Sequence, residues 1–172
     1  MPRLPSFLGL LAALVVAAPL AGCVDEADVD GPVAPGEPVS LGALEAAVAP
    51  YGEWIDTPRY GLVFRPAASP DFVPYASDGR WVRSDDGWEF ESDDPWGPVT
   101  YHYGRWVDDA ALGWVWVPDT TWGPAWVDWR MNDAYIGWVP LAPGGFVGVY
   151  GPWFFVRARD FVRPYVAAHV VR

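Results

Sequence analysis

A β-hairpin is encoded in YGRWVDDAALGWVWVP, residues 103–118. Residues 113–117 alternate between the faces of a strand, with Trp114 and Trp116 on one face and Val115 and Val117 on the other. Residues 108–111 predict the turn, and the proline at the end stops the pairing because it lacks the backbone N–H that a ladder needs. A hairpin alone is barely stable, so this one must pack against other units.

Related units recur along the chain. A GxW phrase ends at Trp54, Trp81 and Trp106, at intervals of 27 and 25 residues, and a glycine follows each tryptophan after six or seven residues. A fourth, incomplete unit begins near Asn132. Short strands at regular spacing with turn signals are typical of all-β folds. We therefore expect an all-β domain of tandem Trp-rich hairpin repeats of ~26 residues that form an antiparallel meander, a small barrel or a sandwich.

Each unit also contains a third element, which we interpret as an extra strand. It spans residues 71–75, 95–99 and 121–126. After the repeats we expect two strands, 146–150 and 153–156, around a Gly-Pro turn, and a helical turn near residues 158–162. Residues 165–170 are consistent with a last strand or a short helix.

The N-terminus has the pattern of a bacterial export signal. Arg3 precedes an apolar run of fourteen residues, 7–20. Its last residue, Leu20, begins the phrase LAGC, which ends at Cys23. A membrane-spanning helix needs about 20 apolar residues, which favours a cleaved signal. LAGC resembles the lipobox of bacterial lipoproteins, which implies a signal peptide over 1–22 and a lipid on Cys23. In some bacteria an aspartate directly after the cysteine keeps a lipoprotein from the outer membrane. Val24 occupies this position here, which implies an outer-membrane location in the cell envelope. Whether the protein faces the periplasm or the cell surface is left open.

Residues 23–50 are interpreted as a tether, and residues 51–172 as the Trp-rich β-repeat domain. The tether is rich in acidic residues, proline and glycine, a composition that buries too little apolar area to fold. Within it, Ser40 is a suitable N-cap for a short helix that carries Leu41, Leu44 and Val48 on one face.

The composition excludes several classes of function. The chain has 22 acidic residues, 11 arginines, no lysine and a net charge of −11, so we expect no nucleic-acid partner. Its lone cysteine is assigned to the lipid. His102 and His169 stand in no metal-ligand or triad pattern, and the acidic runs 84–87 and 91–94 lack EF-hand spacing. We therefore expect no catalytic residues, no metal and no cofactor.

The GxW, GWxxxP and WGP phrases resemble those of an uncharacterised family of Trp-rich exported bacterial proteins, some of which carry a FecR-type domain. A tail like FVRARDF, residues 155–161, follows the repeats in those proteins. The resemblance covers roughly residues 51–170 and implies no activity.

The tryptophans have two interpretations. Most are expected to fill the core, because large aromatic side chains are mostly buried. A subset that follows proline or flanks a loop is expected to stay exposed and to stack on sugar rings. The candidates, with two tyrosines that would alternate on one strand, are Trp96, Trp122, Trp153, Tyr101 and Tyr103. Arg80 and Arg105 are each interpreted as surface arginines resting on a cross-strand aromatic ring.

We therefore expect a lipid-anchored, non-enzymatic binding module of the envelope. Its partner would be a cell-wall or surface polysaccharide. The alternative is a structural scaffold that binds another envelope protein. An exposed aromatic row would favour the glycan, and a flat apolar patch would favour the protein partner.

Overall fold

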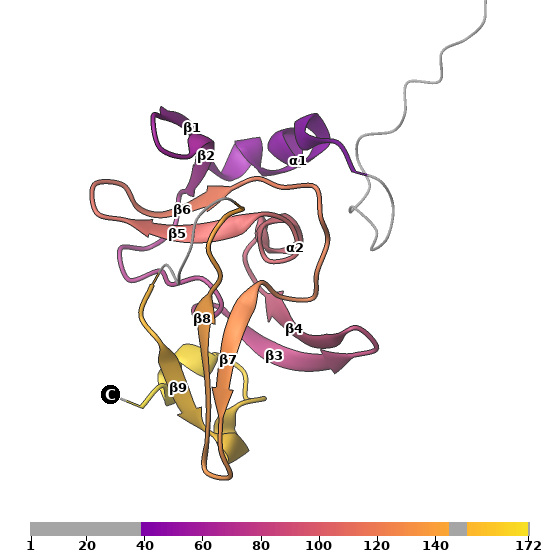
Figure 1. Ribbon diagram of the computed structural model, residues 1–172, viewed down its shortest axis with the longest axis vertical. Coiled ribbons are helices and arrows are strands. Elements are labelled where there is room, and N and C mark those ends of the chain that lie inside the picture. Colours follow the sequence, from indigo (N-terminus) through magenta and orange to yellow (C-terminus); the bar gives the residue numbers. More distant parts are fainter. Residues whose placement is uncertain (1–38, 145–150, 172) are drawn as a thin grey trace, which may run out of the picture.

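The computed structural model describes residues 39–144 and 151–171 (Figure 1). The predicted signal peptide, Cys23 and the predicted strand 146–150 lie outside these residues. Four hairpins follow one another along the chain, and a ninth strand joins the last hairpin. Their strands are β1 (Gly52–Thr57), β2 (Gly61–Pro66), β3 (Gly79–Ser84), β4 (Gly87–Ser92), β5 (Arg105–Asp109), β6 (Gly113–Val117), β7 (Val127–Met131), β8 (Tyr135–Pro140) and β9 (Phe154–Arg157).

The strands form three antiparallel sheets. A four-stranded sheet has the order β1-β2-β6-β5, the β3–β4 hairpin is a sheet of its own, and β7-β8-β9 form the third. The all-β prediction is confirmed. Among the described strands no sheet closes on itself, so the arrangement is that of a meander or sandwich rather than a small barrel.

The GxW repeat has a packing explanation. In each of the four hairpins a tryptophan of the first strand pairs with an aromatic residue of the second. The pairs are Trp54–Phe64, Trp81–Phe90, Trp106–Trp116 and Trp129–Trp138. In the first three hairpins the glycine two residues earlier lies under the partner ring: a Cβ on Gly79 would stand 2.7 Å from the Phe90 ring and 2.5 Å from the Glu91 carbonyl oxygen. Only glycine leaves that space free.

The core is a cluster of aromatic rings around Trp81. This side chain is 1% exposed and contacts the rings of Tyr75, Phe90, Trp129, Trp138 and Phe161. It stacks on Tyr75 and Phe161, with centroid distances of 6.0 and 5.6 Å, and meets Trp129 edge-on at 4.8 Å. Edge-on and offset arrangements are the favourable ones for aromatic pairs.

The helix α1 (Leu41–Val48) is confirmed and belongs to the folded body. Ser40 caps it by accepting a hydrogen bond from the Ala43 N–H at 3.1 Å. Leu44 and Val48 are fully buried in the main core, so the folded part includes residues that we had assigned to the tether. A short 3-10 turn, η1 (Ala49–Tyr51), links α1 to β1.

The third element of each unit is not a strand, which corrects the sequence-based prediction. Residues 97–100 form the short helix α2 (Gly97–Thr100), with a proline in its first turn, while 71–75 and 121–126 are turns and loops. In the tail, β9 and the 3-10 turn η2 (Ala158–Asp160) agree with the prediction. The last element is the short 3-10 helix η3 (Val166–His169).

Candidate binding site

The twelve tryptophans all lie in the described part of the chain, and none of them is classed as exposed. Seven are half-buried. The other five are buried: Trp81, Trp96, Trp106, Trp116 and Trp138. A row of freely exposed tryptophans is therefore absent from the described surface, and any aromatic contact with a ligand must use one of the half-buried rings.

Three of the five predicted ligand-binding residues lie in the core, which corrects their assignment to an exposed platform. Trp96, Tyr101 and Tyr103 are 6%, 0% and 1% exposed. Tyr101 and Tyr103 follow α2 instead of alternating along a strand, and both rings turn inward. Tyr101 packs against Tyr75 and Phe90, with centroid distances of 5.0 and 4.8 Å.

Trp153 and Trp122 are half-buried at separate places. Trp153 stacks on Phe155 at 6.0 Å, and the Arg130 guanidinium lies 4.2 Å from the centre of its ring. Trp122 lines a hollow that Trp153 does not reach. The structure therefore does not bring the predicted residues together, and Trp122 alone combines partial exposure with a concave site.

The hollow beside Trp122, which we call the Trp122 pocket, has a volume of about 350 Å³. Strand β4 and the following turn supply three carboxylates. α2 and its C-terminal end supply Pro98 and His102. The full lining is Glu89, Phe90, Glu91, Ser92, Asp93, Gly97, Pro98, His102 and Trp122. An aromatic ring and a few polar groups around a concavity are the usual composition of a small-ligand site.

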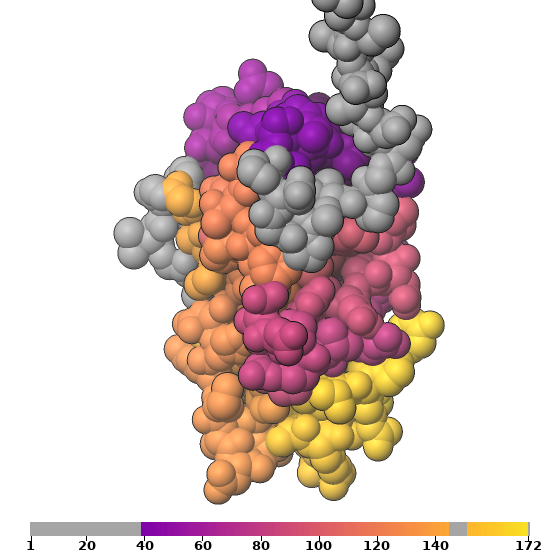
Figure 2. All heavy atoms as spheres, turned by 90° about the vertical axis from the view of Figure 1, so that its right-hand side faces the viewer, coloured from indigo at the N-terminus to yellow at the C-terminus, as the bar shows by residue number. Residues whose placement is uncertain are grey.

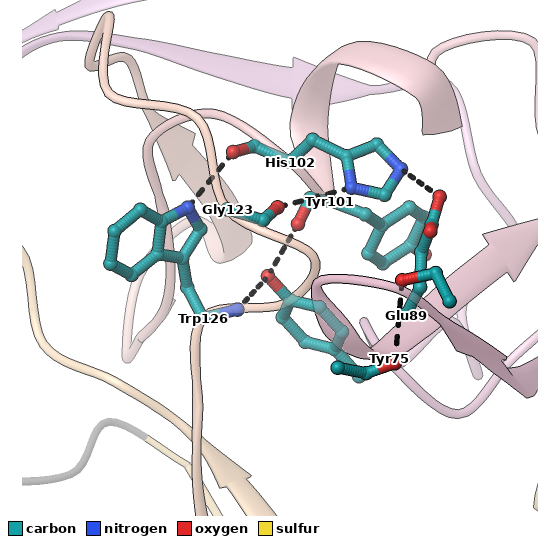
Figure 3. A network of polar contacts seen from close by, with 8 residues as sticks. Tyr75, Glu89, Tyr101, His102, Gly123 and Trp126 are labelled. Carbon is teal, nitrogen blue, oxygen red and sulfur yellow. Dashed lines mark hydrogen bonds and ion pairs between the residues drawn. The ribbon is translucent and has the colours of Figure 1, made fainter. Parts of the chain in front are cut away.

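His102 lines this pocket and contacts Gly123 and Glu89 through its two ring nitrogens (Figure 3). Its ring stacks on Trp122, with centroids 5.8 Å apart and planes 17° apart. Nδ1 lies 3.2 Å from the Gly123 carbonyl oxygen, which can only accept a hydrogen bond, so Nδ1 carries the proton. Nε2 lies 3.8 Å from a Glu89 carboxylate oxygen. Burial lowers the pKa of His102, against the opposing effects of Gly123 and Glu89, so the ring is neutral at pH 7 with its lone pair on Nε2.

Hydrogen bonds from Trp126 fix the loop of residues 121–126, which carries Trp122, against His102 and Tyr75 (Figure 3). Trp126 donates from Nε1 to the His102 carbonyl oxygen at 2.9 Å and from its backbone N–H to the Tyr75 hydroxyl at 3.2 Å. The Tyr75 hydroxyl donates to the Tyr101 carbonyl oxygen at 3.1 Å. Arg105 covers the Trp126 ring, with its guanidinium 3.4 Å from the ring centre. Arg105 thus rests on an aromatic ring, but that ring belongs to the 121–126 loop and not to a paired strand, whereas Arg80 forms an ion pair with Glu91.

Asp94, which follows the pocket residue Asp93 in the chain, has a perturbed carboxyl group. Burial raises its pKa to about 6, and the nearby Asp78 and Asp93 add to the rise, while a hydrogen bond from Ser92 opposes it. The Ser92 hydroxyl donates to an Asp94 carboxylate oxygen at 3.2 Å. Several carboxylates thus share a small region, and at neutral pH they give the pocket a strongly negative potential.

A larger hollow of about 770 Å³ lies between residues 65–73 and the tip of the β5–β6 hairpin. Arg65, Asp71, Asp108 and Trp114 line it, together with apolar loop residues. None of the predicted ligand-binding residues contributes to it.

The residues of the Trp122 pocket do not form a metal centre. Over residues 39–144 and 151–171, no group of three or more His, Cys, Asp or Glu side chains is arranged to hold an ion. None of the described helices is long and apolar enough to cross a membrane. The chemistry that the pocket offers is therefore hydrogen-bond acceptance by carboxylates and an imidazole nitrogen beside an aromatic face.

The sequence predicted Trp122 but missed its partners. Glu89 and Glu91 alternate with Phe90 along β4, so their common face follows from strand periodicity. His102 was interpreted as a packed residue between two tyrosines, and no local signal places it beside Trp122 and Glu89. Those contacts depend on how α2 and the 121–126 loop return to β4.

Comparison with known proteins gives one match. A family of unknown function, DUF6600, matches residues 45–145, which is more than half of the chain. No curated protein matches the chain. No solved structure matches it either. The match confirms that the chain is one of an uncharacterised family. The lipoprotein signal and the resemblance to FecR-containing proteins stay predictions.

Proposed function

The chain belongs to the DUF6600 family, whose function is unknown, and from its own residues we propose that it is a lipid-anchored, non-enzymatic binding module of the bacterial envelope that binds a polysaccharide. We assign the sugar site to the Trp122 pocket. The observation that carries this assignment is the half-buried Trp122 ring beside Glu89, Glu91 and Asp93 in one concavity.

The pocket has the two kinds of group that a sugar needs. Sugar rings have C–H faces that pack on flat aromatic surfaces, and Trp122 supplies such a surface, held parallel to His102. Sugar hydroxyls donate hydrogen bonds, and carboxylates accept them strongly because they are charged. The neutral His102 adds a further acceptor at Nε2. The same carboxylates disfavour ligands that carry negative charge at this position.

The serine of the Trp122 pocket is not placed as a nucleophile for His102, which supports binding over serine-type catalysis. Ser92, the hydroxyl residue of the pocket, donates instead to Asp94. A serine nucleophile would need a hydrogen bond to the imidazole that acts as its base.

The predicted anchor is compatible with this geometry. Fifteen residues separate Cys23 from Val39, the first described residue, and a fully extended chain of that length spans roughly 50 Å. Such a tether allows the domain to reach a polymer near the membrane that carries the lipid.

The test is calorimetric titration of the purified full-length protein with neutral polysaccharides and peptidoglycan fragments. We expect weak, saturable binding that Trp122→Ala reduces about two- to tenfold, the range that corresponds to about 0.5–1.5 kcal/mol for one aromatic contact. Trp153→Ala is the matched control, because it removes a half-buried tryptophan that lies outside the pocket.

Two results would contradict the proposal. One is the absence of binding to every glycan together with saturable capture of a purified envelope protein, which would favour the scaffold alternative. The other is an equal loss of glycan binding in both variants. Mass spectrometry of the same preparation reports whether residues 1–22 are removed and Cys23 is acylated.

A further inference from the structure

The charge of the molecule is divided unevenly along the chain. Residues 39–126 contain fourteen acidic residues and five arginines, whereas residues 127–171 contain three acidic residues and four arginines. The acidic net charge from which we expect no nucleic-acid partner therefore belongs to the tether and the first three hairpins. Residues 127–171 are not acidic overall, because their arginines outnumber their acidic residues. The binding partner of this part of the domain is therefore considered separately.

Three of the four arginines in residues 127–171 lie between the end of β9 and the residues just after η2. We call Arg157, Arg159 and Arg163 the C-terminal arginine cluster. The backbone beneath them is held firmly. Ala158 donates its N–H to the Ala134 carbonyl at 2.9 Å, and Phe161 is 1% exposed and stacks on Trp81. The guanidinium groups thus project from a backbone that the aromatic core positions.

These guanidinium groups make few contacts with the rest of the described structure. In the described part of the chain Arg157 is exposed and makes no ion pair, side-chain hydrogen bond or ring contact. Arg159 and Arg163 share the single carboxylate of Asp160, at 3.7 and 3.1 Å, and their side chains are 75% and 59% exposed. Packing explains the phenylalanines and the valine of the FVRARDF tail, but it does not explain Arg157 and Arg159.

Arg157 and Arg159 line the same hollow. It has a volume of about 270 Å³ and is completed by Asp133, Ala134, Tyr135 and Ala158. Two guanidinium groups can bind one phosphate or carboxylate through several charge-assisted hydrogen bonds, and the tyrosine adds a hydroxyl donor. Asp133 opposes an anion there, and it is the only carboxylate that lines the hollow.

The cluster lies at the end of the molecule away from α1. β9 and the C-terminal segment occupy one end of the long axis and α1 the other (Figure 1). In the space-filling view the C-terminal segment (yellow) lies next to the β7–β8 hairpin (orange), with the β3–β4 hairpin between it and α1 (Figure 2). The chain toward Cys23 joins the domain at α1, so the cluster lies at the end of the domain opposite this point of attachment.

We propose that the C-terminal arginine cluster is a second binding surface, for an envelope polymer that carries phosphate or carboxylate groups. One anionic group of the polymer enters the hollow between Arg157 and Arg159, and the next one contacts Arg163. The proposal does not depend on the Trp122 pocket. Together the two surfaces would let one domain contact a polymer through sugar rings at one site and through anionic groups at the other.

The experiment measures binding of the full-length protein to polyphosphate, polygalacturonate, dextran and phosphatidylglycerol vesicles. We expect binding to both polyanions, weakening as salt rises from low to physiological concentration, and none to dextran through this surface. Arg157→Gln/Arg159→Gln should reduce polyanion affinity about three- to thirtyfold, the range for two exposed charge contacts. Asp133→Asn should strengthen binding, because it removes the carboxylate from the hollow.

The matched control is Arg65→Gln/Arg80→Gln, which removes the same charge from two exposed cross-strand pairs in the acidic part. It should leave polyanion binding within about twofold of wild type. Trp122→Ala should leave the binding of polyphosphate, which has no sugar rings, unchanged, which separates this proposal from the sugar site. Equal losses in the two double variants, binding to vesicles alone, or no effect of Asp133→Asn would overturn the proposal. Matching thermal midpoints would show that the variants are folded.

Discussion

The two faces of the β3–β4 hairpin show how one short segment serves both the core and the surface. Trp81 and Phe90 point inward and meet the rings of Tyr75, Tyr101, Trp129 and Phe161. On the outer face Arg80 pairs with Glu91, while Glu89 and Glu91 line the Trp122 pocket. Because successive residues of a strand point to opposite sides, the packing of the inner face sets the position of the outer carboxylates.

The largest effect is expected from the inner face. Trp81→Ala should lower the free energy of unfolding by about 3–5 kcal/mol, because it leaves a cavity at the centre of the aromatic cluster. Chemical denaturation measures the loss. Trp81→Phe should cost clearly less, because a ring is kept and the buried Trp81 Nε1, which has no partner among the described residues, is removed. A cost for Trp81→Ala below about 1 kcal/mol would contradict the burial of this side chain.

A smaller loss is expected where the two strands touch most closely. Gly79→Ala should lower the free energy of unfolding by about 1–3 kcal/mol, since its Cβ would meet the Glu91 carbonyl oxygen at 2.5 Å and force the strands apart. Gly42→Ala is the matched control. Gly42 lies in α1 with no atom within 4 Å of an added Cβ, so alanine there should stabilise the protein by up to about 1 kcal/mol. Two substitutions of the same sign would break the explanation given for the GxW phrase.

The smallest effect concerns the edge of the outer face and depends on pH. Asp94 has a folded-state pKa of about 6, above the ordinary value of about 4 for an aspartate. Between these two values the folded state binds a proton that the unfolded state lacks, so stability falls as the pH rises from about 4 to about 6. Asp94→Asn should remove this fall, and its thermal midpoint should gain on wild type between pH 4.5 and pH 7.5.

The control for this pH effect is Asp85→Asn, which removes a carboxylate from the exposed turn of the same hairpin. A pH-dependent gain that is seen in Asp94→Asn and not in Asp85→Asn is assigned to the Asp94 carboxyl group. A constant difference for Asp94→Asn would show that the carboxyl group is not perturbed by its surroundings.

Sequence reasoning succeeded for elements built from neighbouring residues. The hairpin of residues 103–118, the α1 N-cap at Ser40 and the 3-10 turn after β9 all depend on residues within one turn or one hairpin of each other. It was wrong for residues 95–99, where a tryptophan between two prolines was interpreted as part of a strand. There the chain turns into α2, and Trp96 packs edge-on against Phe72 at 6.2 Å.

The candidate sites show the same division. Strand periodicity was sufficient to place Glu89 and Glu91 together, and partial exposure of Trp122 agreed with its prediction. Placing His102 beside them required the return of the chain from α2 to β4. The net charge of the chain predicts an acidic surface, but it does not show that Arg157 and Arg159 line one hollow.

By itself the sequence determined the all-β class, the repeat and the hairpin units, because GxW spacing and period-two alternation act between residues that pair locally. Only the tertiary structure decided which tryptophans face the core and which reaches a pocket. That choice depends on contacts between distant residues, such as the hydrogen bond from Trp138 Nε1 to the Tyr75 carbonyl, 63 residues apart. The local sequence around a tryptophan does not state how deeply its ring is buried. The packing of one hairpin on another gives the twelve tryptophans their different environments.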